Sequence, residues 1–143
     1  MPSETTKTET YSLTSQVGFN LRRANQRHVA IFAKHVAGLT PTQFAVLARI
    51  QECGALSQNK LGRLTAMDSA TIKGVVERLR AKGLVQSSPD QSDQRLRLVD
   101  LTAEGRSAFD TALGQALAAR AETVEQLSED EVATFEALLA KLI

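Results

Sequence analysis

The sequence predicts a mainly α-helical fold with a small β-hairpin wing, arranged as a winged helix-turn-helix. A short helix and a second, amphipathic helix are separated by residues 65–67, the length of link found in helix-turn-helix units. Two short strand patterns around a polar tip then follow, at residues 84–99. Long apolar stripes with helical spacing precede and follow this central unit, so the wing belongs to a helical protein.

The composition is that of one ordinary globular domain. The chain has 143 residues, of which 43% are hydrophobic and 23% are charged, as is typical of soluble proteins. It contains no apolar run of about 18 residues, so we expect no membrane span. Residues 1–10 are rich in Thr, Ser and Glu and should form a mobile tail. Because the N-terminus lacks an apolar signal region, we expect a cytoplasmic location.

The first long helix is expected from about Leu13 to Val36. One seam of this helix should face other helices, and its residues are Val17, Leu21, Ala24, His28, Ile31 and His35. Both histidines of the chain therefore lie on the seam, with Phe32 beside them. They are either core residues with satisfied hydrogen bonds or polar contacts in a ligand pocket. A metal site is disfavoured because His28 and His35 are seven positions apart, and we expect no cofactor.

A second helix should run from Thr40-Pro41 to Gly54. Proline suits the first helical position, where its missing N–H costs nothing. The single cysteine of the chain, Cys53, excludes an intramolecular disulfide bond. It follows an amphipathic run, so we expect a small core residue, with a redox-sensing role as the alternative.

The helix-turn-helix itself is marked by polar residues that can cap helices. Ser57 should begin the short helix and Asp68 the second one, which should end at Gly83. The second helix has an apolar face at helical spacing, and its opposite face carries Ser69, Thr71, Lys73, Gly74, Glu77, Arg78 and Lys82. Small residues in the first turn followed by basic ones suit a helix that enters a DNA major groove, although a solvated surface helix would look similar.

The wing is predicted as a strand at residues 84–87, a turn at residues 88–93 and a second strand at residues 95–99. In the second strand, basic and apolar residues alternate, as in a half-buried strand. Arg95 and Arg97 follow the tip closely, and arginine is favoured in the negative potential of a narrow minor groove.

Two further helices should complete the chain. Thr102 caps the first, whose apolar stripe continues to about residue 127 through Phe109, Leu113, Leu117, Ala121, Val124 and Leu127. Ser128 and Glu131 form a capping box for the last helix. A domain of this size cannot bury the stripes of its first and last helices internally, so they need a partner.

Charge is distributed unevenly along the chain. Residues 1–56 and residues 57–100 each carry a net charge of +3, whereas residues 101–143 carry −5. The predicted winged unit is therefore basic, and basic surfaces supply most of the non-specific affinity for DNA.

In the order and spacing of its motifs, the chain resembles the MarR family of bacterial transcription regulators. The resemblance covers roughly residues 13 to 143, and its motifs lie at residues 39–44, Leu61, Leu64, residues 75–79, 82–85, 93–95 and 98–102, and Gly105. Many members carry a basic residue where this chain has Ser92, which puts one wing–phosphate contact in doubt. The overall sequence also resembles the branch of the family that controls nicotinate degradation.

The resemblance implies a homodimer on double-stranded DNA. Residues 11–143 would form a single domain, in which residues 11–37 and 103–143 supply the dimerisation helices and residues 40–101 the winged unit. Two-fold symmetry implies a pseudo-palindromic operator. The family further implies a repressor that is released by a small aromatic carboxylate or phenol.

These expectations assign roles to particular residues. Ser69, Ala70, Thr71 and Lys73 should face bases, while Gln58, Arg78, Arg95 and Arg97 should hold phosphates or a groove. Asp93 should brace Arg95, because phosphates repel a carboxylate. The family's pocket corresponds to residues near His28, Phe32, His35, Thr42 and Phe44.

An enzyme is not expected. The sequence has no glycine-rich phosphate loop, no Cys/His metal set and no pattern of nucleophile and base. No carboxylate lies within sequence reach of the two histidines. A winged helix that binds protein is the other alternative, but it would expose apolar residues where Ser69, Thr71, Lys73 and Arg78 stand.

Overall fold

The computed structural model describes residues 10–143, so the tail predicted at residues 1–10 lies outside the described residues, apart from an exposed Thr10. A short 3-10 turn at Leu13–Ser15 precedes the regular elements. In chain order these are α1 (Val17–His35), α2 (Pro41–Cys53), β1 (Leu56–Ser57), α3 (Gln58–Leu64), α4 (Ser69–Ala81), β2 (Val85–Pro89), β3 (Arg97–Leu101), α5 (Ala103–Thr123) and α6 (Glu129–Ala140).

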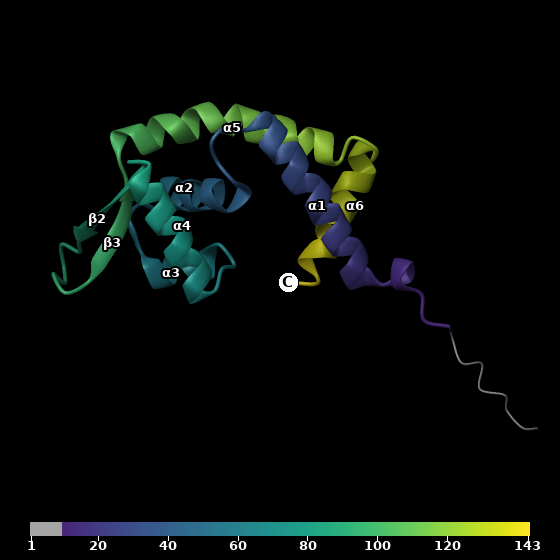
Figure 1. Cartoon of the computed structure of the whole chain (residues 1–143), viewed down its shortest axis with the longest axis horizontal. Helices are drawn as coiled ribbons and strands as arrows, with labels where there is room; N and C mark the ends of the chain where they lie inside the picture. Colours follow the sequence, from purple (N-terminus) through teal and green to yellow (C-terminus); the bar gives the residue numbers. More distant parts are fainter. Residues whose placement is uncertain (1–9) are drawn as a thin grey trace, which may run out of the picture.

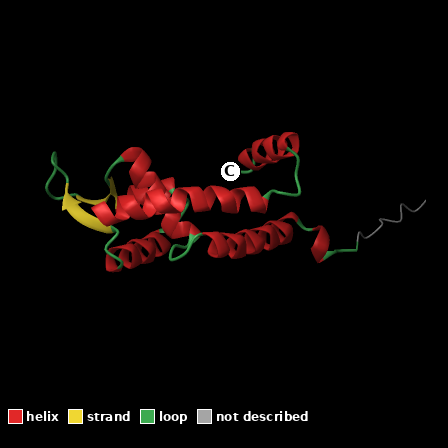
Figure 2. Cartoon of the chain, turned by 90° about the horizontal axis from the view of Figure 1, so that it is seen from above, coloured by secondary structure: helices red, strands yellow, loops and turns green. Residues whose placement is uncertain are grey.

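The molecule is a winged unit joined to a group of long helices. In Figure 1, α5 runs along the top from the winged unit, which comprises α2 to β3, to the end where α1 and α6 lie. Figure 2 shows the strands gathered at one end of the molecule and the long helices extending away from them. The prediction of a mainly helical fold with a hairpin wing is confirmed. No helix among residues 10–143 is both long enough and apolar enough to cross a bilayer.

The helix boundaries follow from local capping chemistry, as predicted. A side-chain oxygen accepts a hydrogen bond from a first-turn backbone N–H at Thr40, Ser57, Asp68, Thr102 and Ser128. Gly54 and Gly83 follow α2 and α4 with φ values of 79° and 74°, a backbone region that favours glycine.

Two helices are shorter than expected. Gln16 is extended, with φ −86° and ψ 130°, and separates the turn at Leu13–Ser15 from α1. Polar side chains hold this break, since Gln16 Nε2 donates to the Ser12 carbonyl at 3.1 Å and Asn20 Nδ2 donates to the Thr14 carbonyl at 3.1 Å. At the other end of the chain, α5 stops at Thr123 rather than near residue 127.

The wing is a three-stranded antiparallel sheet in the order β1-β3-β2. Leu56 pairs with Val99, and Val85 pairs with Leu101. Both predicted strands are present, but their predicted bounds, residues 84–87 and 95–99, are wrong, because β2 extends to Pro89 and β3 runs from Arg97 to Leu101. The buried pair Val99 and Leu101 fixes β3 against the core, which leaves Leu96 49% exposed beyond the strand.

Two apolar clusters hold the described chain together. The larger one joins α2, α3, α4 and the sheet around Leu47, Leu61, Ile72 and Leu79. In the smaller one, Ile31 and Phe32 of α1 and Val36, which follows the helix, pack against Ala112 and Ala119 of α5. The small side chains of these alanines let α1 approach α5 closely.

The apolar stripes at the ends of the chain face outward. Leu113 and Leu117 of α5 are 42% and 58% exposed, and Val17 and Leu21 of α1 are 67% and 43% exposed. Helix α6 buries no residue at all. Within one chain, the seam predicted for α1 is therefore buried at Ile31, half-buried at the two histidines and exposed at its other positions.

Candidate nucleic-acid interface and ligand hollow

The first turn of α4 is exposed and firmly anchored. Ser69, Ala70, Thr71 and Lys73 are all exposed, while Ile72 on the opposite face is 1% exposed. The Thr71 backbone N–H donates to Asp68 Oδ1 at 2.8 Å. This hydrogen bond lowers the pKa of the Asp68 carboxyl group below its usual range, so the cap stays charged near neutral pH. Small side chains thus stand at the helix start, where a partner surface can approach closely.

Two residues that were predicted to contact DNA phosphates lie on either side of this turn. Gln58 is the first residue of α3 and is half-buried, whereas Arg78 is exposed on α4. The Arg78 guanidinium lies along the helix over Gly74, with Nη1 3.4 Å from where a β-carbon at Gly74 would stand. Gly74 therefore leaves room for the arginine to lie on the exposed face.

The predicted brace in the wing is present. Asp93 Oδ1 accepts hydrogen bonds from the Arg95 backbone N–H at 3.1 Å and from Arg95 Nε at 3.2 Å. The Arg95 side chain is nevertheless 92% exposed, so the brace orients the guanidinium without covering it. Arg97 is also exposed, at the start of β3 opposite Pro89.

The tip of the wing is closed by a second carboxylate. Asp90 Oδ1 accepts from the backbone N–H and from the hydroxyl of Ser92, each at 2.8 Å. The backbone hydrogen bond is the main cause that lowers the pKa of the Asp90 carboxyl group. Ser92, the residue that departs from the family pattern, therefore shapes the tip.

The residues predicted to bind a ligand are brought together only in part. His28, Phe32 and Phe44 form an aromatic row with Phe109 of α5, with ring centroids 6.2, 5.9 and 5.5 Å apart in that order. Thr42 lies outside the row, because it is exposed and its hydroxyl is 3.2 Å from the Thr40 hydroxyl. The rings of the row lie in contact with one another. Phe109 was expected in an apolar stripe but not among the residues of a ligand pocket.

Both histidines have hydrogen-bond partners on α5. His28 Nδ1 lies 2.9 Å from Thr123 Oγ1, and His35 Nε2 lies 3.1 Å from Glu122 Oε1. Lys34 Nζ also donates to Glu122 Oε1, at 2.5 Å. The hydrogen bond from Lys34, followed by that from His35, lowers the pKa of the Glu122 carboxyl group. Although no carboxylate is near these histidines in sequence, the fold supplies one.

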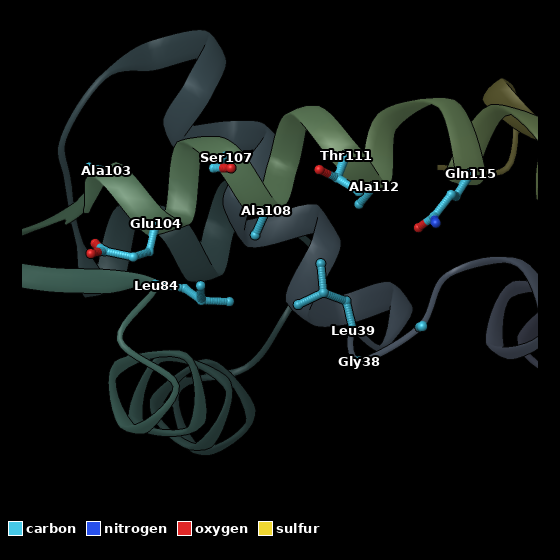
Figure 3. Close-up of a pocket in the computed structure, with 11 residues that line it drawn as sticks. Gly38, Leu39, Leu84, Ala103, Glu104, Ser107, Ala108, Thr111, Ala112 and Gln115 are labelled. Carbon is cyan, nitrogen blue, oxygen red and sulfur yellow. The ribbon is translucent and has the colours of Figure 1, made fainter.

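A hollow of about 640 Å³ lies elsewhere, between the α1–α2 link, the start of β2 and the first half of α5. Leu39 and Leu84 lie on one side of it, and α5, which carries a stripe of polar lining residues, lies on the other (Figure 3). The stripe consists of Glu104, Ser107, Thr111 and Gln115, and spacings of three and four positions could have revealed it in the sequence. Its size and mixed lining suit a small planar molecule with polar substituents.

None of the five predicted ligand residues lines this hollow. Phe32 and Phe44 lie one layer behind it instead. Leu39 and Ala112 line the hollow and also belong to the cluster that contains Phe32 and Phe44. The placement of the ligand residues directly around a pocket is therefore not observed in the single chain.

The prediction for Cys53 as a core residue is wrong. Cys53 is the last residue of α2 and is exposed. No cluster of three or more His, Cys, Asp or Glu residues suited to a metal ion occurs within residues 10–143.

Residues 39–96 match the sequence model of the MarR family. The transcriptional repressor NicR of Pseudomonas putida is 46% identical over 105 residues, which make up 72% of this chain and 66% of NicR. The multiple antibiotic resistance protein MarR of Escherichia coli is 30% identical over 132 residues, which cover 89% of this chain and 90% of that protein.

Solved structures show the same fold. BpsR of Bordetella bronchiseptica, whose DNA binding is regulated by 6-hydroxynicotinic acid, has a TM-score of 0.87 at 39% identity, over 93% of this chain and 96% of its own. A mutant of Escherichia coli MarR in complex with operator DNA has a TM-score of 0.81 at 27% identity, over 88% and 92% of the two chains.

Proposed function

The chain belongs to the MarR family of transcriptional regulators, and on that premise we propose a ligand-responsive repressor that binds a pseudo-palindromic operator as a homodimer. The observation that carries the proposal is the exposed, capped first turn of α4 together with the braced, exposed Arg95 of the wing. A helix start that presents small polar side chains suits base edges, and an arginine on a hairpin suits a minor groove.

Within this proposal, Ser69, Ala70, Thr71 and Lys73 face base edges. Gln58, Arg78 and Arg97 hold phosphates, and Arg95 enters the minor groove while Asp93 braces it. The exposure of this face and the similarity to a MarR structure with operator DNA support these roles. The absence of large exposed apolar residues on α4 argues against a protein-binding winged helix.

The proposed dimer is formed by the outward-facing stripes of α1, α5 and α6. Leu21, Leu117, Phe135 and Leu138 are 41% to 58% exposed within one chain, and an apolar surface of this kind needs a cover. A second copy supplies the same surface, and two-fold symmetry places the two α4 helices about 34 Å apart, one turn of DNA. Such a protein acts on chromosomal DNA, so we place it in the cytoplasm.

The proposed effector is a small aromatic acid, with a hydroxylated pyridine carboxylate as the first candidate, because NicR and BpsR are among the relatives. We place it in the hollow. Ser107, Thr111 and Gln115 offer hydrogen-bond donors to a carboxylate, and Glu104 accepts from a ring hydroxyl or N–H. The aromatic row behind the hollow, with His28 and His35, holds its wall in place.

A genomic DNA-binding selection with the purified chain tests the proposal, run with and without nicotinate, 6-hydroxynicotinate and benzoate. We expect one palindromic site whose recovery is lost with a single acid. A site that no acid disturbs would contradict the effector assignment. Recovery of no site would favour the protein-binding winged helix.

The position of the effector site is tested separately. Gln115→Leu should weaken binding of the active acid at least ~5-fold in calorimetry, because it removes an amide from the hollow. His28→Leu, in the row behind, should change that affinity less. A larger loss of affinity in His28→Leu than in Gln115→Leu would place the effector site at the aromatic row instead.

A further inference from the structure

Lys82 ties the end of α4 to the link between α1 and α2. Its Nζ donates to the Gly38 carbonyl and, at 3.2 Å, to Gln43 Oε1. Gln43 is only 5% exposed, and its Oε1 also accepts from the Thr40 backbone N–H at 3.2 Å. One ammonium group therefore joins the last turn of α4 to both ends of the segment at residues 38–43.

The other side of the α4 exit is fixed to α5. The Thr102 hydroxyl donates to the Gly83 carbonyl at 2.6 Å, and the Thr102 backbone N–H donates to the Leu84 carbonyl at 3.1 Å. A β-carbon at Gly105 would stand 2.0 Å from that Leu84 oxygen, so α5 can come this close only because residue 105 is glycine. The exit of α4 is thus held rigidly on α5, and through Lys82 on the link.

The hollow lies between these two attachments. Gly38 and Leu39 line it on the side of the link, Leu84 lines it at the exit of α4, and Ala108 projects into it from α5 (Figure 3). A molecule that overfills the resting hollow must widen the separation of the link from α5. Leu39 of the link also packs on the core cluster that contains Leu79, but the side-chain hydrogen bonds between the link and the end of α4 are those of Lys82. Because the exit is held on α5, we expect these hydrogen bonds to be the contact that yields.

We propose that Lys82 is the positioning residue through which occupation of the hollow changes the placement of the recognition helix α4. This inference rests on the proposed function, since it assigns the coupling between effector and DNA to one residue. An occupied hollow displaces Gly38, releases the Lys82 ammonium and loosens the last turn of α4. Coupling of this kind requires an element that both sites bias, and here that element is the segment at residues 38–43.

The test places an aromatic group in the hollow without any assumption about the natural effector. In a Cys53→Ser background, Ala108→Cys is alkylated with N-benzylmaleimide, and hydrogen–deuterium exchange of the full-length protein is followed by mass spectrometry. We expect the label to speed exchange of the amides at residues 78–84 by about fivefold or more. With Lys82→Met added, exchange there should be fast before labelling and should change less than about twofold on labelling.

Three controls make the result specific. Lys82→Arg keeps a cationic donor and should restore much of the response. Arg80→Met removes the same charge from α4, but Arg80 makes no side-chain hydrogen bond or ion pair with the part of the chain that is described, so the response should persist. The unchanged chain labelled at its exposed Cys53 should show no effect at residues 78–84.

An equal response with and without Lys82, or no response to the label when Lys82 is present, would overturn the inference. Binding to the selected operator fragment is measured on the same proteins, and the label should lower DNA affinity at least ~10-fold only when Lys82 is present. If exchange responds but no DNA fragment is ever bound, the coupling stands and the proposed function fails.

Discussion

At the scale of single residues, the wing depends on the brace between Asp93 and Arg95. Arg95→Ala should weaken operator binding by about 1–3 kcal/mol, because it removes a guanidinium that is held ready in an exposed position. Fluorescence anisotropy with the selected operator fragment measures this loss.

Arg106→Ala is the matched control, since Arg106 is an exposed arginine of α5 outside the proposed interface. It should leave the affinity within a few tenths of a kcal/mol of wild type, apart from a small general effect of charge. Equal losses for the two variants would show that Arg95 contributes only charge and that the wing assignment is wrong.

Glu122 gives the stability of the chain a pH dependence. Its pKa is lowered by Lys34 and then by His35, so the carboxylate is stabilised in the folded state. The contribution is complete above the ordinary glutamate pKa of about 4.3 and is lost as pH falls through the lower folded value. The free energy of unfolding from urea titrations at fixed protein concentration should therefore drop below about pH 4.3, and Glu122→Gln should make the drop shallower.

The control for this pH effect is Glu125→Gln. Glu125 is exposed and its side chain has no hydrogen bond or ion pair within the described residues 10–143. Removal of the Glu125 charge should leave the pH dependence of the free energy of unfolding unchanged. An unaltered slope in Glu122→Gln would mean that the Lys34–Glu122–His35 contacts do not contribute to stability.

Residues whose role is set by their neighbours in sequence were the most predictable. The caps at Ser57, Asp68 and Thr102 depend on an N–H three positions ahead, so the sequence contains both partners. The pair His35–Glu122 spans 87 positions, and no local pattern can reveal it. The exposure of Cys53 was missed for a similar reason, because the side of α2 that packs is decided by α5, α4 and the sheet, which are distant in sequence.

At the scale of elements, the joint between α5 and β2 depends on Gly105. Gly105→Ala should destabilise the protein by about 1–3 kcal/mol or more, because a β-carbon would overlap the Leu84 carbonyl oxygen. Urea denaturation at fixed protein concentration measures the change.

Gly74→Ala in α4 is the opposite case. The nearest atom to its added β-carbon is 3.4 Å away, at the mobile end of Arg78, so the lower chain entropy of alanine should stabilise the helix by about 0.5–1 kcal/mol. Similar losses for both variants would show that the close approach at Gly105 is not what limits substitution there.

The wing shows where a strand pattern falls short. The alternation at residues 95–99 marked a strand correctly, but alternation alone cannot tell which apolar residue is the first to reach the core. Val99 and Leu101 are the buried ones, and their pairing with Ser87 and Val85 sets the register. The two-residue β1 was missed because its second residue, Ser57, is also the cap of α3.

At the scale of the whole molecule, the exposed stripe of α5 should control assembly. Leu117→Glu should convert the proposed dimer to a monomer at micromolar concentration, because it places a charge in an apolar interface. Sedimentation velocity measures the mass. Leu96→Glu is the control, since Leu96 is similarly exposed, at 49% against 58%, but lies in the wing. Unchanged mass for Leu117→Glu would exclude this face from the interface.

The long stripes themselves could be predicted from helical spacing, but not which residues pack within the chain. Ala112 and Ala119 form the contact with α1, while the larger Leu113 and Leu117 remain outside. The hollow could not be predicted from the sequence for the same reason. It exists because three segments far apart in the chain, around Leu39, Leu84 and Ser107, meet without filling the space.

The packing of α1 on α5 also determines the order in which the parts of the chain can fold during synthesis on the ribosome. The winged unit closes once Leu101 has been made and β3 can pair with β1 and β2. Ile31 and Phe32 leave the ribosome far earlier, yet their partners Ala112 and Ala119 are translated only after the whole winged unit. Throughout that interval the side of α1 that packs on α5 in the finished chain lacks this cover, and Phe44 and Leu39 are the only members of the cluster outside α1 and α5, apart from Val36, that have already been made.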